Sequence, residues 1–405
     1  MFKNSWVTVI SAQHKFTLTS RIRVLKISKV HYNNMPRLIT IPALVDPHVH
    51  FRTPGGEHKE DWNTGTQAAL AGGVTTVFDM PNTNPPTTTL ELVRAKKTMI
   101  EKTLTEYKRV LRYYFYLGAT ATNLAEIARC QNEIIGVKLF MGASTGNLQV
   151  EDDVVVEEIF RECGRLGIVL AIHCEDEAVL QQAKSDFVGT PTARDHGRLR
   201  PRTAAITALQ KAIQWSEKYQ TRVYVLHVST AEEIELIKAA KAKGIAIFAE
   251  VTPHHLFLNE TDLEHLGNLG KMNPPLRTAT DQAALWSGIH DGTVDTIGTD
   301  HAPHTLEEKN LDYAQAPSGV PGIETYLALL LDANHRGLIS LDEITRLTRT
   351  NIQRIFNLPE NNDTVTIDLE LVKIIRNEDM LTKCKWSPFA GKTLNGWPIL
   401  AQIKD

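Results

Sequence analysis

The sequence has little cysteine and no surplus of charge of either sign. Its four cysteines, Cys130, Cys163, Cys174 and Cys384, are far apart and form no CxxC pair. We therefore expect reduced, buried thiols and no disulfide framework. With 44 Lys and Arg residues against 47 Asp and Glu residues, the formal net charge is -3. The chain therefore has no excess of positive charge that would attract nucleic acid or an anionic membrane.

The sequence also lacks long hydrophobic runs. No stretch of about 18 consecutive apolar residues occurs, so we expect no transmembrane helix. The first residues, MFKNSWVTVISAQHK, contain no convincing core of a signal peptide. A length of 405 residues with 42% hydrophobic content is enough for one large domain with a small appendage. These features predict a cytoplasmic protein that acts on a small molecule.

Eight short apolar runs alternate with stretches of helical spacing. The runs span residues 39–46, 73–80, 112–119, 135–141, 167–174, 222–228, 244–251 and 294–300. Helical spacing is clear at 60–73, 152–167 and 229–244. Continuous Val- and Ile-rich runs are typical of parallel strands that are buried on both faces. Eight strand-helix units therefore predict an α/β fold, a closed (β/α)8 barrel of the TIM type. An open, doubly wound sheet is the alternative.

Strand-like runs also occur at both ends of the chain. They lie before residue 39 and in DTVTIDLELVKII, after about residue 362. We predict that residues 1–39 and 363–405 together form a small β domain, and that residues 40–362 form the barrel.

Polar residues recur where the predicted strands end. In a barrel of this type the reacting groups come from the C-terminal ends of the strands. The residues at or near these ends are His48, His50, Lys138, His173, His227 and Asp300. His48 and His50 are two positions apart, so an extended strand directs both to one side, where both can bind one metal. A single histidine at a strand end is more often a hydrogen-bonded core residue, but a set of this size favours a site for zinc or a similar ion.

Lys138 lies inside an apolar run, GVKLFMG. A charged lysine is costly to bury, so this residue is expected to be modified or paired. Burial favours the neutral amine, which reacts with carbon dioxide to give an anionic carbamate that bridges two cations. A salt bridge to a nearby carboxylate is the alternative.

Ten motifs follow one another over residues 40–400. In order they are DPHVHFR, DMPNTNPPT, GVKLFMGAS, AIHCED, LHVS, EVTPHHL, NPPLR, GTDHAPH, GVPGIET and SPFAGKTLNGWP. This series resembles the amidohydrolase superfamily and, within it, the dihydroorotase family. The resemblance implies reversible, zinc-dependent cyclisation of N-carbamoyl-L-aspartate to (S)-dihydroorotate in pyrimidine biosynthesis. It also implies a homo-oligomer and an association with aspartate transcarbamoylase.

The same resemblance implies roles for individual residues. His48 and His50 bind one zinc ion, His173 and His227 bind a second, carboxylated Lys138 bridges them, and Asp300 completes the ligand set and acts as the catalytic proton shuttle. Arg52, Asn82 and His304 hold the substrate carboxylate, and Asn273 contacts the ring. Glu250, His254 and His255 are expected near the site without being ligands, and His301 is expected to orient the Asp300 loop.

Two other functions remain as alternatives. Dihydropyrimidinases, hydantoinases and allantoinases share the barrel and the metals, but Arg52 favours a substrate that carries a carboxylate, because a guanidinium matches a carboxylate in bidentate fashion. An inactive scaffold homologue is disfavoured, because every expected metal ligand is present. The Gly-rich segment 142–147 is a candidate cover over the substrate. The arginines of segment 190–202 are expected on a solvated surface.

Overall fold

The structure is a computed structural model that describes residues 37–143 and 148–404. The described residues belong to one compact unit, Pro36–Asp405. The strands predicted within residues 1–36 and most of the Gly-rich cover, residues 144–147, lie outside the described part of the chain. Among the residues described, no helix has both the length and the apolar character that a membrane crossing requires.

An eight-stranded parallel sheet forms the centre of the molecule, and its strands pair in sequence order. They are β2 (Leu44–Val49), β3 (Val74–Asp79), β4 (Arg112–Gly118), β5 (Gly136–Phe140), β6 (Leu170–His173), β7 (Val223–Val225), β8 (Ile247–Val251) and β9 (Thr296–Ile297). Each of the eight predicted runs contributes one of these strands. The predicted barrel is therefore confirmed, and an open doubly wound sheet is excluded.

Contacts between β2 and the segment after β9 bring the two ends of the sheet together. Val49 and His301 form a parallel bridge, and the backbone N of His50 donates to the backbone O of His301 over 2.8 Å. Asp46 accepts from the backbone N and the hydroxyl of Thr299. These bonds hold the strand ends that carry His48, His50 and Asp300 next to one another.

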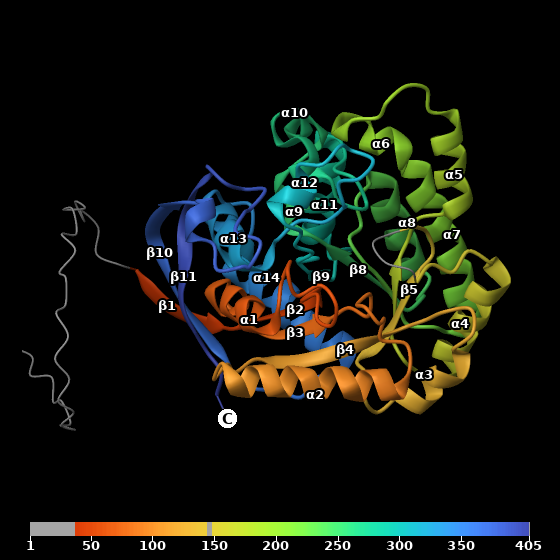
Figure 1. Cartoon of the computed structure of the whole chain (residues 1–405), viewed down its shortest axis with the longest axis horizontal. Coiled ribbons are helices and arrows are strands. Elements are labelled where there is room, and N and C mark those ends of the chain that lie inside the picture. The colour runs from red at the N-terminus through yellow and green to blue at the C-terminus, as the bar shows by residue number, and fades with distance from the viewer. Residues whose placement is uncertain (1–36, 144–147, 405) are drawn as a thin grey trace, which may run out of the picture. The chain divides into compact units, whose positions relative to one another are not determined.

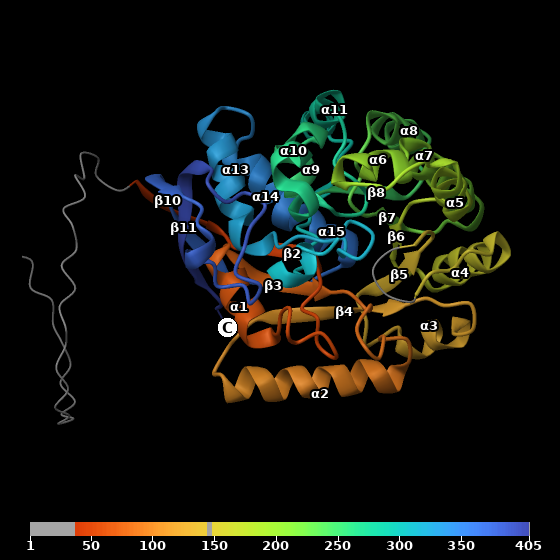
Figure 2. The ribbon, with the colours of Figure 1, turned by 45° about the horizontal axis from the view of Figure 1, so that its top comes forward.

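Helices lie on the outer side of the strands, as Figures 1 and 2 show for α2 along β4. The helices are α1 (Trp62–Ala71), α2 (Leu90–Glu106), α3 (Leu124–Cys130), α4 (Asp153–Leu166), α5 (Glu177–Asp186), α6 (His196–Leu199), α7 (Arg202–Tyr219), α8 (Ala231–Ala242), α9 (Pro253–Phe257), α10 (Leu263–Leu266), α11 (Ala279–Asp291), α12 (Leu306–Lys309), α13 (Tyr326–His335), α14 (Leu341–Thr345) and α15 (Asn351–Phe356). The sequence explains their limits: Thr230 and Glu233 form a capping box at the start of α8, and Gly167 ends α4 at φ +69°.

The first predicted run, 39–46, is divided between two sheets. Its first half is β1 (Leu38–Pro42), which pairs antiparallel with β10 (Thr364–Ile374), and β10 pairs with β11 (Thr393–Gln402). Pro42 cannot donate a ladder hydrogen bond, and β2 starts two residues later. A single strand over 39–46 was therefore a wrong expectation, although a small β domain built from the two ends of the chain is confirmed.

The segment between β10 and β11 returns to the barrel. The indole N–H of Trp386 donates to the backbone O of His304 over 2.7 Å, and the Thr382 hydroxyl donates to Glu60. Trp386 and Phe389 belong to an apolar cluster with Met272 and Val320. The C-terminal segment thus helps to fix the loops beyond the strand ends.

All four cysteines are buried and unpaired, as expected.

Candidate active site

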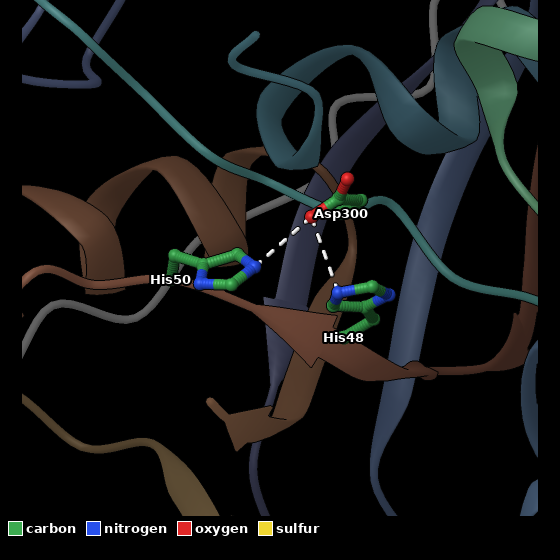
Figure 3. Close-up of side chains that lie close together, drawn as sticks. All are labelled: His48, His50 and Asp300. Carbon is green, nitrogen blue, oxygen red and sulfur yellow. Dashed lines mark hydrogen bonds and ion pairs between the residues drawn. The ribbon is translucent and has the colours of Figure 1, made fainter. Parts of the chain in front are cut away.

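Three predicted metal ligands converge where β2 and β9 end. Oδ1 of Asp300 lies 3.1 Å from Nε2 of His48 and 3.0 Å from Nε2 of His50. Figure 3 shows both imidazole rings directed at this one oxygen. All three side chains are buried, and their ligand atoms lie within 4.8 Å of one another. The group is compact enough to hold a single metal ion.

Glu250, at the end of β8, lies behind His48. Its Oε1 is 2.8 Å from Nδ1 of His48 and accepts from the backbone N of His227 over 3.2 Å. Burial acts to lower the pKa of His48, but Asp300 and Glu250 outweigh it and raise the pKa to about 9. Two buried carboxylates around one imidazole thus favour positive charge here, which a bound cation supplies.

His173 and His227 form a second pair of ring nitrogens. Nδ1 of His173, at the end of β6, lies 3.0 Å from Nε2 of His227, which follows β7. Burial lowers the pKa of both residues, and the charge of Lys138 lowers it further. His227 has φ +41°, a strained conformation for a non-glycine residue and one that often occurs at functional sites. Two neutral imidazoles that face each other in this way match a second pair of metal ligands.

Lys138 lies inside β5 and is 1% exposed. Its Nζ is 4.6 Å from the centre of the Phe140 ring. Burial lowers the pKa of Lys138 to about 7, although Asp300 and Glu250 act against this shift. Within residues 37–143 and 148–404 no Asp or Glu carboxylate lies at ion-pair distance from this amine, so the alternative of a simple salt bridge finds no support there. A buried amine that is easily neutralised suits carbamate formation.

The donors of this region fit divalent metal ions. Imidazole and carboxylate ligands suit zinc and similar ions. Two buried imidazole nitrogens, Nδ1 of His227 and Nε2 of His254, have no hydrogen-bond partner. Buried polar atoms are rarely left unpaired in this way, which is consistent with a site that binds a further group.

Arg52 borders a cavity beside these ligands. The cavity is lined by His50, Arg52, Asn82, Asn273, Asp300, Ala302, Ser318 and Gly319. Arg52 is 7% exposed, and burial lowers its pKa to about 10. Its Nε donates to the backbone O of Pro303 over 3.1 Å, and no carboxylate in the described part of the chain forms an ion pair with it. A buried guanidinium without a carboxylate partner is suited to an anionic ligand.

The other predicted substrate contacts take different positions. Asn273 lines the cavity, and so does Asn82, whose Oδ1 lies 2.8 Å from Nδ1 of His50. His304 lies next to Arg52, with Nε2 3.1 Å from Nη2 of Arg52, and its Nδ1 lies 3.1 Å from Nζ of Lys59. It is not among the residues that line the cavity. The structure therefore brings Arg52, Asn82 and Asn273 to one cavity and places His304 against Arg52.

The predicted solvated surface at residues 190–202 was wrong for Arg200. Arg194 and Arg198 are exposed, but the Arg200 side chain is 8% exposed and forms an ion pair with Glu175 over 2.5 Å. Burial acts to raise the pKa of Glu175, but Arg200 and His173 lower it well below its usual range. The sequence held no signal for this burial, because Arg200 stands between Arg198 and Arg202 in the run RLRPR.

Glu60 was also missed. This fully buried carboxylate lies 3.3 Å from Nε2 of His301, and Nδ1 of His301 accepts from the backbone N of Gly322 over 3.1 Å. His301 directly follows Asp300, so these contacts fix the backbone that carries the carboxylate, in agreement with the expected orienting role of His301. No local sequence pattern links Glu60 to residue 301.

The model of the amidohydrolase family matches residues 39–367. A dihydroorotase of Methanosarcina acetivorans is 36% identical over 371 residues, which are 87% of this chain and 78% of that protein. The chain belongs to the dihydroorotases of the amidohydrolase family. This membership implies a metal-dependent cyclic amidohydrolase, in agreement with the group formed by His48, His50 and Asp300.

Two further comparisons place this amidohydrolase among its relatives. The multifunctional protein CAD of Squalus acanthias is 37% identical over 372 residues, which cover 91% of this chain and 15% of CAD. Among solved structures, the L-hydantoinase (dihydropyrimidinase) of Arthrobacter aurescens aligns with a TM-score of 0.84 at 28% identity, over 90% of this chain and 84% of that one. The sequence relatives and the structural neighbour thus belong to two related kinds of cyclic amidohydrolase.

Proposed function

We propose that this protein is a dihydroorotase that interconverts (S)-dihydroorotate and N-carbamoyl-L-aspartate. The single observation that carries the proposal is the buried guanidinium of Arg52, which borders the same cavity as His50 and Asp300 and forms no ion pair with a carboxylate of the described chain. Dihydroorotate places one carboxylate next to a cyclic amide. Arg52 would bind the carboxylate while the ring lies beside the metal ligands.

The proposal includes two zinc ions. His48 and His50 would hold the first, His173 and His227 the second, carboxylated Lys138 would bridge both, and Asp300 would complete the set. Bound ions of this kind supply polarisation of the amide carbonyl and acidification of a water molecule. Two observations support this arrangement: Lys138 is buried, and Nδ1 of His173 lies close to Nε2 of His227.

Asp300 would move the proton. Burial acts to raise the pKa of Asp300, but His48 and His50 lower it well below its usual range, so the carboxylate is ionised. In ring opening it would take the proton of the attacking water and deliver it to the ring nitrogen that leaves. In ring closure the same carboxylate would carry the proton in the opposite direction.

The remaining predicted residues would bind the substrate. Arg52, with Asn82 and His304, would hold the carboxylate, and Asn273 would contact the ring. Bidentate pairing with a guanidinium fixes the orientation of a carboxylate as well as its position. The ring amide would thereby be placed at Asp300 and the metal ligands.

Hydantoinase or dihydropyrimidinase activity is the second candidate, because the aligned hydantoinase structure has a TM-score of 0.84. The two candidate functions differ in whether the substrate carries a carboxylate. Purified protein should therefore be assayed on dihydroorotate, dihydrouracil, hydantoin and allantoin, with the metal content measured in parallel. Dihydroorotate is expected to be the best substrate by at least tenfold in kcat/KM. A preference for dihydrouracil or hydantoin would favour the second candidate.

We further propose that the protein is cytoplasmic, that it forms a dimer or tetramer, and that it associates with aspartate transcarbamoylase. The two assembly proposals rest on the sequence resemblance. Light scattering on the pure protein and on its mixture with aspartate transcarbamoylase tests both assembly proposals. A monomer that stays separate in the mixture would contradict them.

A further inference from the structure

The side chains of Tyr313, His196 and Asn273 form a hydrogen-bonded chain beside a second cavity. This cavity, of about 420 Å³, adjoins the active site and is bordered by Tyr313, His196, Asn273, Lys271 and Arg200 among others. Nδ1 of His196 lies 2.6 Å from Oη of Tyr313, and Nε2 lies 3.0 Å from Oδ1 of Asn273 and 2.9 Å from the backbone O of Met272. His196 begins α6, inside the segment for which the sequence suggested no role.

The Met272 carbonyl fixes which ring nitrogen carries the proton. A backbone carbonyl can only accept, so Nε2 of His196 must be the donor. Burial, with Arg200 and Lys271 nearby, lowers the pKa of His196 to about 3. The ring is therefore neutral and has one N–H, and Nδ1 carries the lone pair. Nδ1 accepts from the Tyr313 hydroxyl, which stays protonated because burial raises its pKa to about 12.

The same proton fixes the amide of Asn273. Because Nε2 of His196 donates, the atom of Asn273 that faces it must be the carbonyl oxygen Oδ1. The NH2 group then points away from His196. Asn273 lines both cavities, including the one shared by Arg52 and Asp300. The amide therefore offers N–H donors to a ligand in the active site.

We propose that His196 and Tyr313 are positioning residues that orient the Asn273 amide as a hydrogen-bond donor to a carbonyl or carboxylate oxygen of the substrate. The proposal deepens the proposed function and rests on it for the identity of the substrate. Without the Tyr313 hydroxyl, Nδ1 of His196 loses its hydrogen-bond donor, and the ring is held at its Nε2 edge alone. The ring would then be less firmly oriented, its Nε2–H would hold Oδ1 of Asn273 less well, and the amide would lose its fixed orientation toward the substrate oxygen.

A double-mutant cycle on dihydroorotate turnover tests this assignment. Tyr313→Phe is expected to raise KM roughly tenfold, the effect of one hydrogen bond, with kcat within about threefold of wild type. Asn273→Ala should raise KM by a similar factor. In the Asn273→Ala background, Tyr313→Phe should change KM less than about twofold, because the amide that it orients is gone. The control is Tyr219→Phe, which removes a hydroxyl that donates to Glu157 over 2.8 Å at the C-terminal end of α7 and should leave KM unchanged.

Nitrogen-15 NMR of histidine-labelled protein provides a second readout that needs no substrate. The resonances of His196, assigned by their loss in His196→Gln, should show a neutral ring with its proton on Nε2 in both proteins, and the Nδ1 resonance should shift in Tyr313→Phe because Nδ1 loses its hydrogen bond. Independent, multiplicative effects on KM, or a ring protonated on Nδ1 or on both nitrogens in wild type, would overturn the proposal. If wild type fails to open dihydroorotate, the proposed function is wrong, and the NMR result still decides the tautomer.

Discussion

Nε2 of His173 lies 2.9 Å from Oε2 of Glu175. Nη2 of Arg200 lies 3.4 Å from the same nitrogen, so Nε2 of His173 is held between a carboxylate and a guanidinium. Arg200 fixes Glu175 through a buried ion pair and also donates to the backbone O of Ala143 over 2.7 Å. The position of one proposed metal ligand is therefore set by two residues outside the proposed ligand set.

The first prediction follows from this contact. Glu175→Gln keeps the shape of the side chain but removes its charge, so the affinity for zinc should fall by roughly 10- to 100-fold. Competition with a chromophoric chelator measures this affinity. Glu162→Gln is the control, because Glu162 forms an exposed ion pair with Arg165 on α4 and should bind zinc as wild type does. Equal affinities in all three proteins would show that Glu175 does not support His173.

The second prediction concerns the carbamate on Lys138. Lys138→Ala should lose most of its metal and activity, because the bridging anion is missing. Acetate or another small carboxylic acid should restore part of both. Exposed Lys102→Ala, on α2, serves as the control. Full activity of Lys138→Ala with unchanged metal content would contradict the carbamate.

The third prediction separates proton transfer from folding. Asp300→Asn removes the charge that accepts the proton, so kcat for ring opening should fall by at least about a hundredfold, while the far-ultraviolet circular dichroism is retained. Metal analysis of the same sample shows how much of the loss reflects a missing ligand. Activity within tenfold of wild type would place the shuttle elsewhere.

The fourth prediction concerns a buried ion pair below the Arg52 loop. Nζ of Lys96 lies 2.5 Å from Oδ2 of Asp79, and Oδ1 of Asp79 accepts from the backbone N of Phe51 over 2.8 Å. Lys96→Met leaves Asp79 buried without its partner, which should lower the free energy of unfolding by about 3–5 kcal/mol. Urea unfolding measures the change. Lys97→Met, one residue along and exposed, should differ little from wild type, and equal stability of the two variants would contradict this account of the pair.

Much of the barrel was predictable, because strands buried on both faces leave continuous apolar runs in the sequence. The polar residues at the strand ends were predictable for the same reason, since His48, Lys138 and His173 stand out against such runs. The division of the first run at Pro42 was not foreseen, because β1 and β2 follow each other without a loop. Their separation depends on pairing with β10, more than 300 residues away.

The supporting residues of the site could not be found in this way. Glu60, His196, Arg200 and Tyr313 lie in loops or at helix starts, where polar residues are common and carry no periodic signal. Their roles depend on contacts between distant segments, such as Tyr313 with His196 and Glu60 with His301. Charge alone predicted a solvated surface for Arg200, and only its contact with Glu175 shows otherwise.

The fifth prediction tests the central claim, that Arg52 selects a substrate with a carboxylate. A charge-assisted bidentate contact in a cavity that excludes water strongly stabilises binding. Arg52→Met should therefore lower kcat/KM for dihydroorotate by roughly a hundredfold or more, while metal content stays unchanged. Arg94→Met, which removes an exposed ion pair with Glu133, is the control.

The most direct measurement is the ratio of kcat/KM for dihydroorotate to kcat/KM for dihydrouracil, in wild type and in Arg52→Met. Dihydrouracil has the same ring without the carboxylate, so its slow turnover should hardly change. The account predicts a high ratio in wild type that collapses by about two orders of magnitude in the variant. An equal loss on both substrates, or a wild type that prefers dihydrouracil, would contradict it.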